Sequence, residues 1–224
     1  MTEIRAVIFD FGGVIIPGSP SGDAEDSPYA RIERAHGLPK GFLWNAVYIE
    51  NPGWLRLRVG DSTEEEWLAH AHKAVTAISS AKTAAAVMAA IEADRPQGRS
   101  LQGREPEFNK GVLGLIRRLR QRYRVGLLSN AAPGLEAELR DHYRIDHLFD
   151  DIINSATVHL AKPDPRIYQL AAERHGVSPG ECFFTDDLIW NVQAARKVGM
   201  RAHRFNGYRG LAGALRAAGV TLKE

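Results

Sequence analysis

Asp10 is a lone carboxylate inside an apolar run, Ala6–Ile16 (AVIFDFGGVII), and a pair of glycines follows it almost at once. A run of this composition predicts a fully buried strand of a parallel sheet. An ionised carboxylate buried without a partner is costly, so we expect Asp10 at the carboxyl end of the strand, facing a cation or hydrogen-bond donors. Gly12 and Gly13 allow the backbone to turn tightly and to approach whatever Asp10 binds.

Three further residue pairs carry groups that can do chemistry, and each falls at or beside the carboxyl end of a predicted strand. They are Ser129-Asn130, Lys162-Pro163 and Asp186-Asp187. In open parallel sheets the carboxyl ends of the strands form the edge where ligands bind. We therefore expect these residues to converge with Asp10.

The acidic members of this group predict a metal site. Asp10, Asp186 and Asp187 can bring two or three oxygens to one hard cation, and Mg²⁺ prefers such ligands. Asn191 lies one helical turn after Asp187, so we expect it to support the same loop. We expect Trp190, beside the acid pair, to be a packing residue.

Taken singly, each cluster has a structural explanation. Ser129-Asn130 is a common turn pair, Lys162 a common surface cation, and Asp186-Asp187 can cap the helix that follows. The functional interpretation depends on all four clusters occurring in one order, each on the element where the chemistry requires it.

Alternating strands and helices would position these clusters. Strands are predicted at Val125–Asn130, Asp151–Asn154, Cys182–Asp187 and Arg201–Arg204, and helices near residues 110–123, 134–143, 166–175, 190–198 and after 207. This alternation predicts a doubly wound α/β fold with a mainly parallel sheet and right-handed crossovers.

The segment between the first strand and this region carries helix signals only. A stretch rich in Gly, Pro and Ser, Pro17–Pro28, predicts an exposed loop. Helical spacing follows over Tyr29–Arg95, where Thr63 and Glu66 fit a capping box, and a second Gly- and Pro-marked connection (QGRSLQGREP) ends the segment. We therefore expect an α/β core domain formed by residues 1–16 and 105–224 and a helical domain formed by residues 17–104.

In this order the four clusters resemble the four motifs of the haloacid dehalogenase-like hydrolase superfamily. The resemblance covers the predicted core and indicates the subfamily with a cap inserted after the first motif. It implies a Rossmann-like core and an α-helical cap that covers the site and shapes specificity. Trp44, Trp54, Arg56 and Arg58 of the predicted cap are assigned no role, because helical spacing does not separate substrate contacts from core packing.

The resemblance implies a Mg²⁺-dependent phosphatase that acts on a small phosphorylated metabolite. Asp10 would attack phosphorus and form an aspartyl-phosphate, and the backbone carbonyl of Gly12 would be a further metal ligand. Ser129, Asn130 and Lys162 would hold the phosphoryl oxygens.

Gly12 departs from the superfamily pattern. Most of its phosphatases carry a second Asp here, which protonates the leaving oxygen and then activates water, and a positioned acid/base contributes about a hundred to ten thousandfold. One interpretation is a phosphatase that uses good leaving groups or takes its acid from the cap or from water, similar to some sugar-phosphate phosphatases with Gly at this position.

Two other interpretations stay open. A 2-haloacid dehalogenase-type hydrolase also lacks the second Asp, but Asp186-Asp187 argues against it, because uncompensated carboxylates repel an anionic substrate. A catalytically weak interaction module that binds metal or phosphate is the third.

Composition indicates a globular protein without a nucleic-acid surface. The 224 residues are 44% hydrophobic, and 29 basic and 27 acidic side chains are mixed along the chain. No apolar stretch is long enough to span a bilayer, so no membrane partner is expected. The single cysteine, Cys182, and an N-terminus without signal-peptide features are typical of a cytoplasmic protein. A monomer or homodimer is expected.

Overall fold

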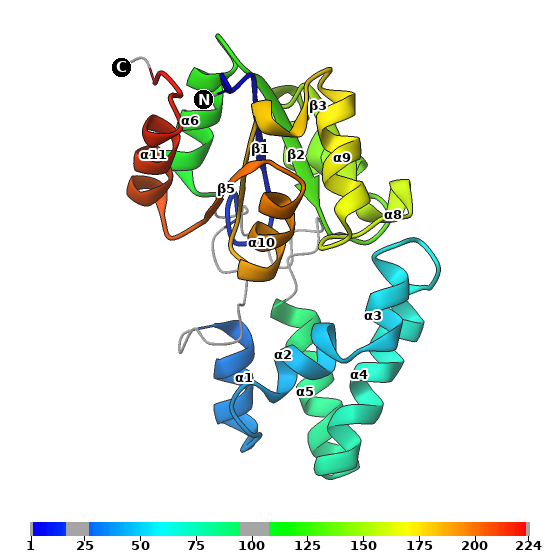
Figure 1. The fold of residues 1–224 in the computed structure, drawn as a ribbon. Coiled ribbons are helices and arrows are strands. Elements are labelled where there is room, and N and C mark those ends of the chain that lie inside the picture. Colours follow the sequence, from blue (N-terminus) through cyan, green and yellow to red (C-terminus); the bar gives the residue numbers. More distant parts are fainter. Residues whose placement is uncertain (1, 17–26, 95–107, 223–224) are drawn as a thin grey trace. The chain divides into compact units, whose positions relative to one another are not determined.

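The computed structural model of the chain describes residues 2–16, 27–94 and 108–222. The chain divides into two compact units, one of Met1–Ser19 with Glu107–Glu224 and the other of Pro20–Pro106 (Figure 1). The loop predicted at Pro17–Pro28 and the connection predicted after Arg95 lie almost entirely outside the described residues. Within the described ranges, no helix is long and apolar enough to cross a membrane.

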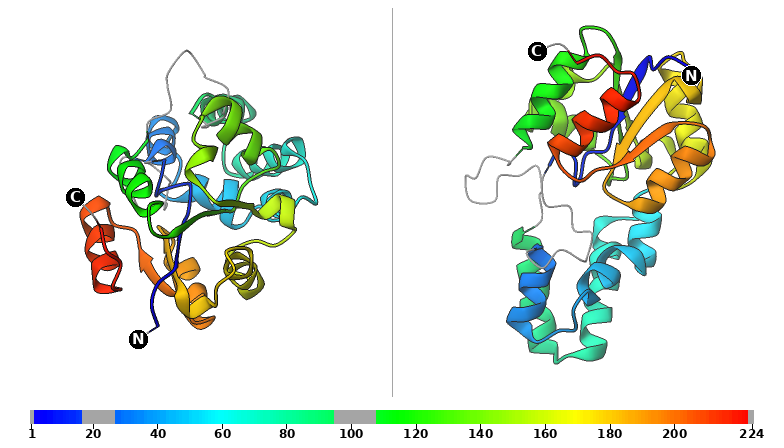
Figure 2. Two further views of the ribbon diagram at one scale, coloured as in Figure 1. Left: turned by 90° about the horizontal axis from the view of Figure 1, so that it is seen from above. Right: turned by 60° about the vertical axis from the view of Figure 1, so that its left-hand side comes forward.

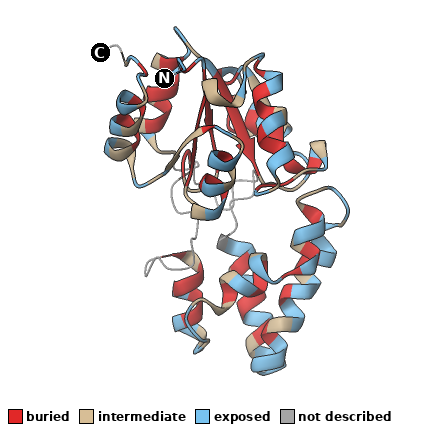
Figure 3. Ribbon diagram, in the orientation of Figure 1, coloured by how far each residue is buried: buried red, intermediate tan, exposed pale blue. Residues whose placement is uncertain are grey.

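The first unit is built on a five-stranded parallel sheet with the strand order β3-β2-β1-β4-β5. The strands are β1 (Ala6–Phe9), β2 (Arg124–Ser129), β3 (Asp151–Asn154), β4 (Cys182–Asp186) and β5 (Arg201–Arg204). β1 and β4 are buried along their whole length, as apolar central strands of a parallel sheet require (Figure 3). The doubly wound α/β fold expected from the sequence is confirmed.

Helices cover both faces of this sheet (Figure 2). They are α6 (Lys110–Leu119) and α11 (Tyr208–Ala217) on one face, and α9 (Pro165–Arg174) and α10 (Ile189–Lys197) on the other. Val7 and Phe9 belong to the core shared with α6 and α11, whereas Ala6 and Ile8 belong to the core shared with α9 and α10. Successive side chains of β1 point to opposite faces of the sheet, so this one strand contributes to the apolar core on each face.

β1 is shorter than the apolar run predicted. The strand ends at Phe9, and the chain then turns, with hydrogen bonds from Gly13 N to Ile16 O (2.9 Å) and from Ile16 N to Phe11 O (3.0 Å). Gly13 has φ 76°, a conformation that glycine adopts without strain. The apolar residues of this turn are buried in the core although they do not belong to the sheet. Because a buried turn and a buried strand are both apolar in sequence, the run predicted one long strand.

The helix predicted over residues 134–143 is a composite. It consists of a short α-helix, α7 (Leu135–Ala137), followed by a π-helical turn at Glu138–His142. The remaining short elements of this unit are α8 (Ser155–Val158) and 3₁₀ turns at Asp146–Leu148 and Pro179–Glu181.

Within residues 27–94 the second unit consists of helices joined by turns, and these residues contain no strand, as expected. Its elements are α1 (Pro28–His36), α2 (Phe42–Trp44), a π-helical turn (Asn45–Ile49), α3 (Pro52–Leu57), α4 (Glu64–Ile78) and α5 (Ala81–Asp94). Thr63 caps α4 by accepting a hydrogen bond from Glu66 N at 3.2 Å. Gly53 allows α3 to lie against α4, because a Cβ there would be 2.6 Å from the Trp67 Cα.

Candidate active site at the carboxyl edge of the sheet

Asp10 lies directly after β1, between the ends of β2 and β4. Phe9 is in register with Leu127 of β2 and Thr185 of β4, and Asp10 N donates to Thr185 O at 2.9 Å. Parallel pairing therefore brings Asp10, the end of β2 and the end of β4 to one edge of the sheet, as predicted.

Lys162 joins the two acidic ends. Its Nζ lies 2.8 Å from Asp10 Oδ1 and 2.7 Å from Asp186 Oδ2, and it donates to Leu128 O at 2.9 Å. Only 1% of the residue is exposed, so the lysine is not the surface cation that its isolated sequence would suggest. Three acceptors occupy the three N–H groups of its ammonium.

Asn130 fixes the backbone of Lys162. Asn130 Nδ2 donates to Lys162 O and Lys162 N donates to Asn130 Oδ1, both at 2.8 Å. The side-chain amide is thereby used to position the lysine. Ser129, the last residue of β2, is buried at the same edge.

Asp186 is held by the start of α10. Its carboxylate accepts from Leu188 N at 2.9 Å, and Asn191 Nδ2 lies 3.1 Å from each of its oxygens. The expected supporting contact from Asn191 is confirmed. Trp190 differs from expectation: it is 43% exposed and does not pack in the core, because its neighbour Asn191 occupies the inward face of the helix.

Asp10 is buried in a negative environment. Its Oδ1 accepts from Phe11 N at 2.7 Å as well as from Lys162, whereas Oδ2 has no hydrogen-bond partner in the described part of the chain. Burial raises the pKa of Asp10 well above its usual range; Lys162 offsets part of this, and the Asp186 and Asp187 carboxylates add to it. For Lys162, burial favours the neutral amine, but Asp10 and Asp186 outweigh it and raise its pKa.

The three carboxylates fit a divalent cation. One oxygen from each of Asp10, Asp186 and Asp187 lies within 4.8 Å of the others. Three carboxylates beside one ammonium leave an excess of negative charge, which a cation would balance. All the candidate ligand atoms are oxygens, the ligand type that Mg²⁺ prefers. Gly12, predicted to add its carbonyl, lies in the turn after Asp10 and bridges to Ile16.

Two residues of this edge were missed by sequence reasoning. Asn154 Nδ2 donates to Ala132 O at 3.0 Å, and Ser155 Oγ accepts from Ala131 N at 3.1 Å, so both support the loop that follows β2. Asn154 is the last residue of β3 and Ser155 follows it, so polar residues at the end of a predicted strand, the signal that identified the other clusters, also marked these two.

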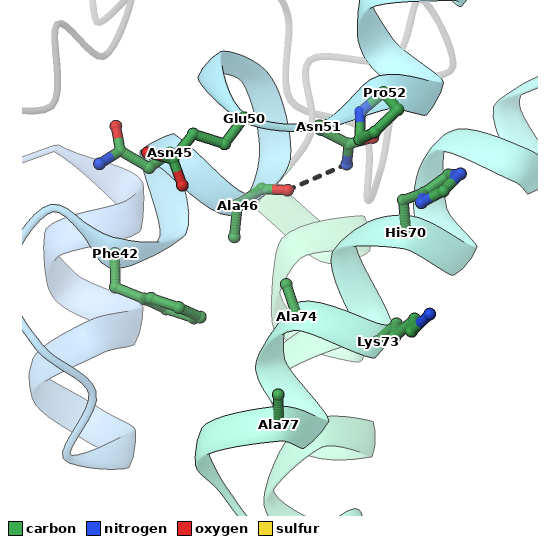
Figure 4. Close-up of a pocket in the computed structure, with 10 residues that line it drawn as sticks. All are labelled: Phe42, Asn45, Ala46, Glu50, Asn51, Pro52, His70, Lys73, Ala74 and Ala77. Atoms are coloured by element: carbon green, nitrogen blue, oxygen red, sulfur yellow. Dashed lines mark hydrogen bonds between the residues drawn. The ribbon is translucent and has the colours of Figure 1, made fainter.

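The helical unit contains a hollow of different character (Figure 4). This pocket, with a volume of about 430 Å³, lies between the π-helical turn and α4 and has an apolar base that includes Phe42, Ala46 and Ala74. Asn51, its buried polar residue, already donates to Ala46 O (2.9 Å) and Trp67 O (3.2 Å). The side-chain amide of Asn51 therefore stabilises the fold of the helical unit and is not directed at a ligand in the pocket.

Comparisons with known proteins identify the family of this chain. Residues 4–199 match the family model of haloacid dehalogenase-like hydrolases. The chain is 40% identical over 85 residues to phosphatase MT3486 of Mycobacterium tuberculosis (strain CDC 1551 / Oshkosh), covering 38% of this chain and 39% of that protein. It is 33% identical over 84 residues to (S)-2-haloacid dehalogenase 4A of Burkholderia cepacia, covering 38% and 36%. Both alignments span less than half of the relative.

The fold is similar to that of solved structures. A HAD family enzyme of Bacteroides thetaiotaomicron, crystallised with magnesium and inorganic phosphate, superimposes with a TM-score of 0.59 at 21% identity, covering 91% of this chain and 95% of that one. At this identity the likeness concerns the fold. Because the family model matches most of its length, the chain belongs to the haloacid dehalogenase-like hydrolase family.

Proposed function

We propose that the protein is a Mg²⁺-dependent phosphatase that hydrolyses a small phosphorylated metabolite through an aspartyl-phosphate on Asp10. The observation that carries this proposal is the convergence of the Asp10, Asp186 and Asp187 oxygens within 4.8 Å, with Lys162 Nζ 2.8 Å from Asp10. Phosphoryl transfer needs an anionic nucleophile and cationic groups beside it, and this edge of the sheet supplies both.

Asp10 is the proposed nucleophile. Phe11 N and Lys162 Nζ orient the carboxylate through Oδ1, and Oδ2 is the oxygen that attacks phosphorus. Mg²⁺, held by Asp10, Asp186, Asp187 and the Gly12 carbonyl, would supply the positive charge that keeps Asp10 ionised and screens it from the phosphate. The bond from phosphorus to the leaving oxygen breaks, and water then releases inorganic phosphate from Asp10.

Lys162 and the end of β2 are proposed to bind the phosphoryl group. Two carboxylates and a backbone carbonyl hold all three N–H groups of the lysine, so it would act on the phosphoryl group through its fixed positive charge; a direct hydrogen bond to a phosphoryl oxygen would replace one of these three contacts. Ser129 would donate its hydroxyl. The side chain of Asn130 is engaged with Lys162, so its proposed contact with substrate is made by the backbone N–H.

The leaving group is expected to be one that departs readily. Gly12 has no side chain to protonate the leaving oxygen, so a proton must come from water or from another group. Substrates whose leaving group has a low pKa need that proton least.

The helical segment, residues 17–104, is proposed to be the cap that shapes substrate choice. Its described part contains Trp44, Trp54 and Arg58, whose side chains are only partly buried. Such side chains suit the recognition of an organic group attached to the phosphate.

Release of inorganic phosphate from a panel of phosphate monoesters, with Mg²⁺ and with chelator, tests this proposal. Halide release from a 2-haloacid, measured in parallel, addresses the activity named for the Burkholderia relative. Chelator-sensitive phosphate release is the expected result. Metal-independent halide release would move the chemistry to carbon and overturn the proposal.

A further inference from the structure

Arg58 is a partly buried cation without a counter-ion. Its Nε is buried and has no hydrogen-bond partner, and within residues 2–16, 27–94 and 108–222 the side chain forms no ion pair. Burial lowers the pKa of this guanidinium, and no nearby carboxylate opposes the effect. A desolvated charge without compensation is unfavourable, so the fold gains nothing evident from this arginine.

Arg56, two residues earlier, provides the contrast. It is exposed, its Nη2 donates to Asp61 O at 2.6 Å, and its Nη1 lies 3.6 Å from Glu66 Oε2. Arg56 therefore stabilises the connection between α3 and α4. Arg58 does not share this role, although both belong to the same short stretch.

Trp54, the residue one helical turn before Arg58, belongs to a group of aromatic rings. Arg58 N donates to Trp54 O at 3.0 Å, so Arg58, the residue that follows α3, lies one helical turn from Trp54. The Trp54 ring centroid is 5.0 Å from that of Tyr48, which is 4.6 Å from that of Trp44. All three rings are only partly buried, so each presents apolar area to solvent. We name Trp44, Tyr48 and Trp54 the aromatic face.

We infer that Arg58 and the aromatic face form a binding site for an organic anion. The guanidinium fork would pair with a carboxylate or phosphate oxygen, and the flat or apolar body of the ligand would pack on Trp54 and Tyr48. Such a ligand would both supply the missing negative charge and cover the exposed part of the rings. The ligand is either the remote end of the phosphorylated substrate or a separate metabolite of the same chemistry.

The site is tested in the full-length protein with benzoate, an aromatic carboxylate, and with benzamide, its neutral isostere. Titration is followed through the tryptophan indole N–H signals in ¹H–¹⁵N spectra, with the Trp54 signal assigned from Trp54→Phe. We expect benzoate to shift the Trp54 signal saturably and to bind about tenfold more tightly than benzamide, the scale of one charge-assisted contact. Binding of benzoate that is no tighter than that of benzamide, or no saturable shift, would overturn the inference.

Two variants locate the charge. Arg58→Gln should weaken benzoate binding about tenfold, Arg58→Lys should weaken it less, and Arg56→Gln, the matched control, should leave it unchanged. Equal losses in the Arg58 and Arg56 variants would overturn the site, as would wild-type binding by Arg58→Gln. Thermal unfolding of each variant verifies that the helical unit is intact.

A kinetic measurement distinguishes the two sources of the ligand. If benzoate raises KM for a phosphate monoester and leaves kcat unchanged, the site takes the organic part of the substrate; if it binds without changing KM, the site takes a separate anion. Both results uphold the Arg58 site. Only the kinetic measurement requires turnover. If the protein released no phosphate, the proposed phosphatase function would be contradicted. The benzoate titration would still decide whether the Arg58 site exists.

Discussion

The Lys162 ammonium lies 2.8 Å from Asp10 Oδ1, and both groups are buried. This contact connects the end of β1 with the segment before α9 and joins the proposed nucleophile to the proposed phosphate-binding cation. Asp186, 2.7 Å from the same Nζ, completes a network in which each charge is held by groups from distant parts of the chain. The predictions below test what each part of this network does.

Asp10→Asn should abolish phosphate release without unfolding the protein. The amide keeps the shape of the side chain but is a far weaker nucleophile. Because the folded pKa of Asp10 is raised, the stability linked to this group is present below its unfolded pKa and is lost as pH rises through the folded value. Without Mg²⁺ at neutral pH, the variant should therefore unfold at an equal or higher temperature than the wild type.

The control for this change is Asp141→Asn, at an exposed carboxylate paired with Arg140 on the surface. It should leave both turnover and thermal stability unchanged. Phosphate release close to the wild-type rate in Asp10→Asn would contradict the assignment of Asp10 as nucleophile.

Asn191→Ala should weaken the metal site. It removes the amide that lies 3.1 Å from both Asp186 oxygens, and loss of a group that orients a ligand typically costs about 10–100-fold in metal affinity or activity. The dependence of kcat/KM on Mg²⁺ concentration measures this. Gln193→Ala, at an exposed position of the same helix, is the matched control. An unchanged Mg²⁺ dependence in Asn191→Ala would mean that Asp186 does not need this support.

Gly12→Asp should raise activity towards substrates with poor leaving groups, because it supplies the missing acid/base. The backbone permits it, since Gly12 does not share the positive φ of its neighbour Gly13. Gly13→Asp, the control, places a side chain at φ 76° and should lower stability without raising the rate. A rate that stays the same or falls in Gly12→Asp would indicate that another group already delivers the proton.

Gly126→Ala should destabilise the core domain by about 1–3 kcal/mol, the typical cost of overpacking. A Cβ at Gly126 would lie 2.1 Å from His175 Nε2, and the imidazole is buried against this strand. Gly114→Ala, in α6, meets nothing within 4 Å and should instead stabilise by about 0.5–1 kcal/mol. Urea unfolding of both variants measures the contrast, and equal stabilities would contradict the packing described.

His175 also predicts a pH dependence of folding. Burial lowers its pKa in the folded state, so its contribution to stability is present above the unfolded value of about 6.5 and is lost as pH falls towards the folded value. The free energy of unfolding should decrease as pH is lowered from about 7 to 5, and His175→Gln should reduce this slope. A slope that is the same in the variant would assign the effect to other groups.

The sheet edge was predictable because its signals are local. Each strand that carries site residues is an apolar run closed by polar residues, so the positions of Asp10, Ser129 and Asp186 follow from composition and from the geometry of parallel sheets. The support from Asn191 followed from helical spacing alone.

What was not predictable depends on contacts between residues far apart in sequence. The pairing of the Asn130 side chain with the Lys162 backbone spans 32 residues and has no local signature. The end of β1 at Phe9 is set by turn hydrogen bonds that an apolar run conceals. The exposure of Trp190 and the missing partner of Arg58 are likewise properties of tertiary packing.

The central claim, that Asp10 carries the phosphoryl group, is tested most directly by acid quenching of the enzyme during turnover with Mg²⁺, followed by mass spectrometry of the peptide that contains Asp10. We predict a phosphoryl adduct on Asp10 in the wild-type enzyme and none in Asp10→Asn or with chelator. Phosphate release without an adduct on this peptide, or an adduct on another residue, would contradict the proposed mechanism.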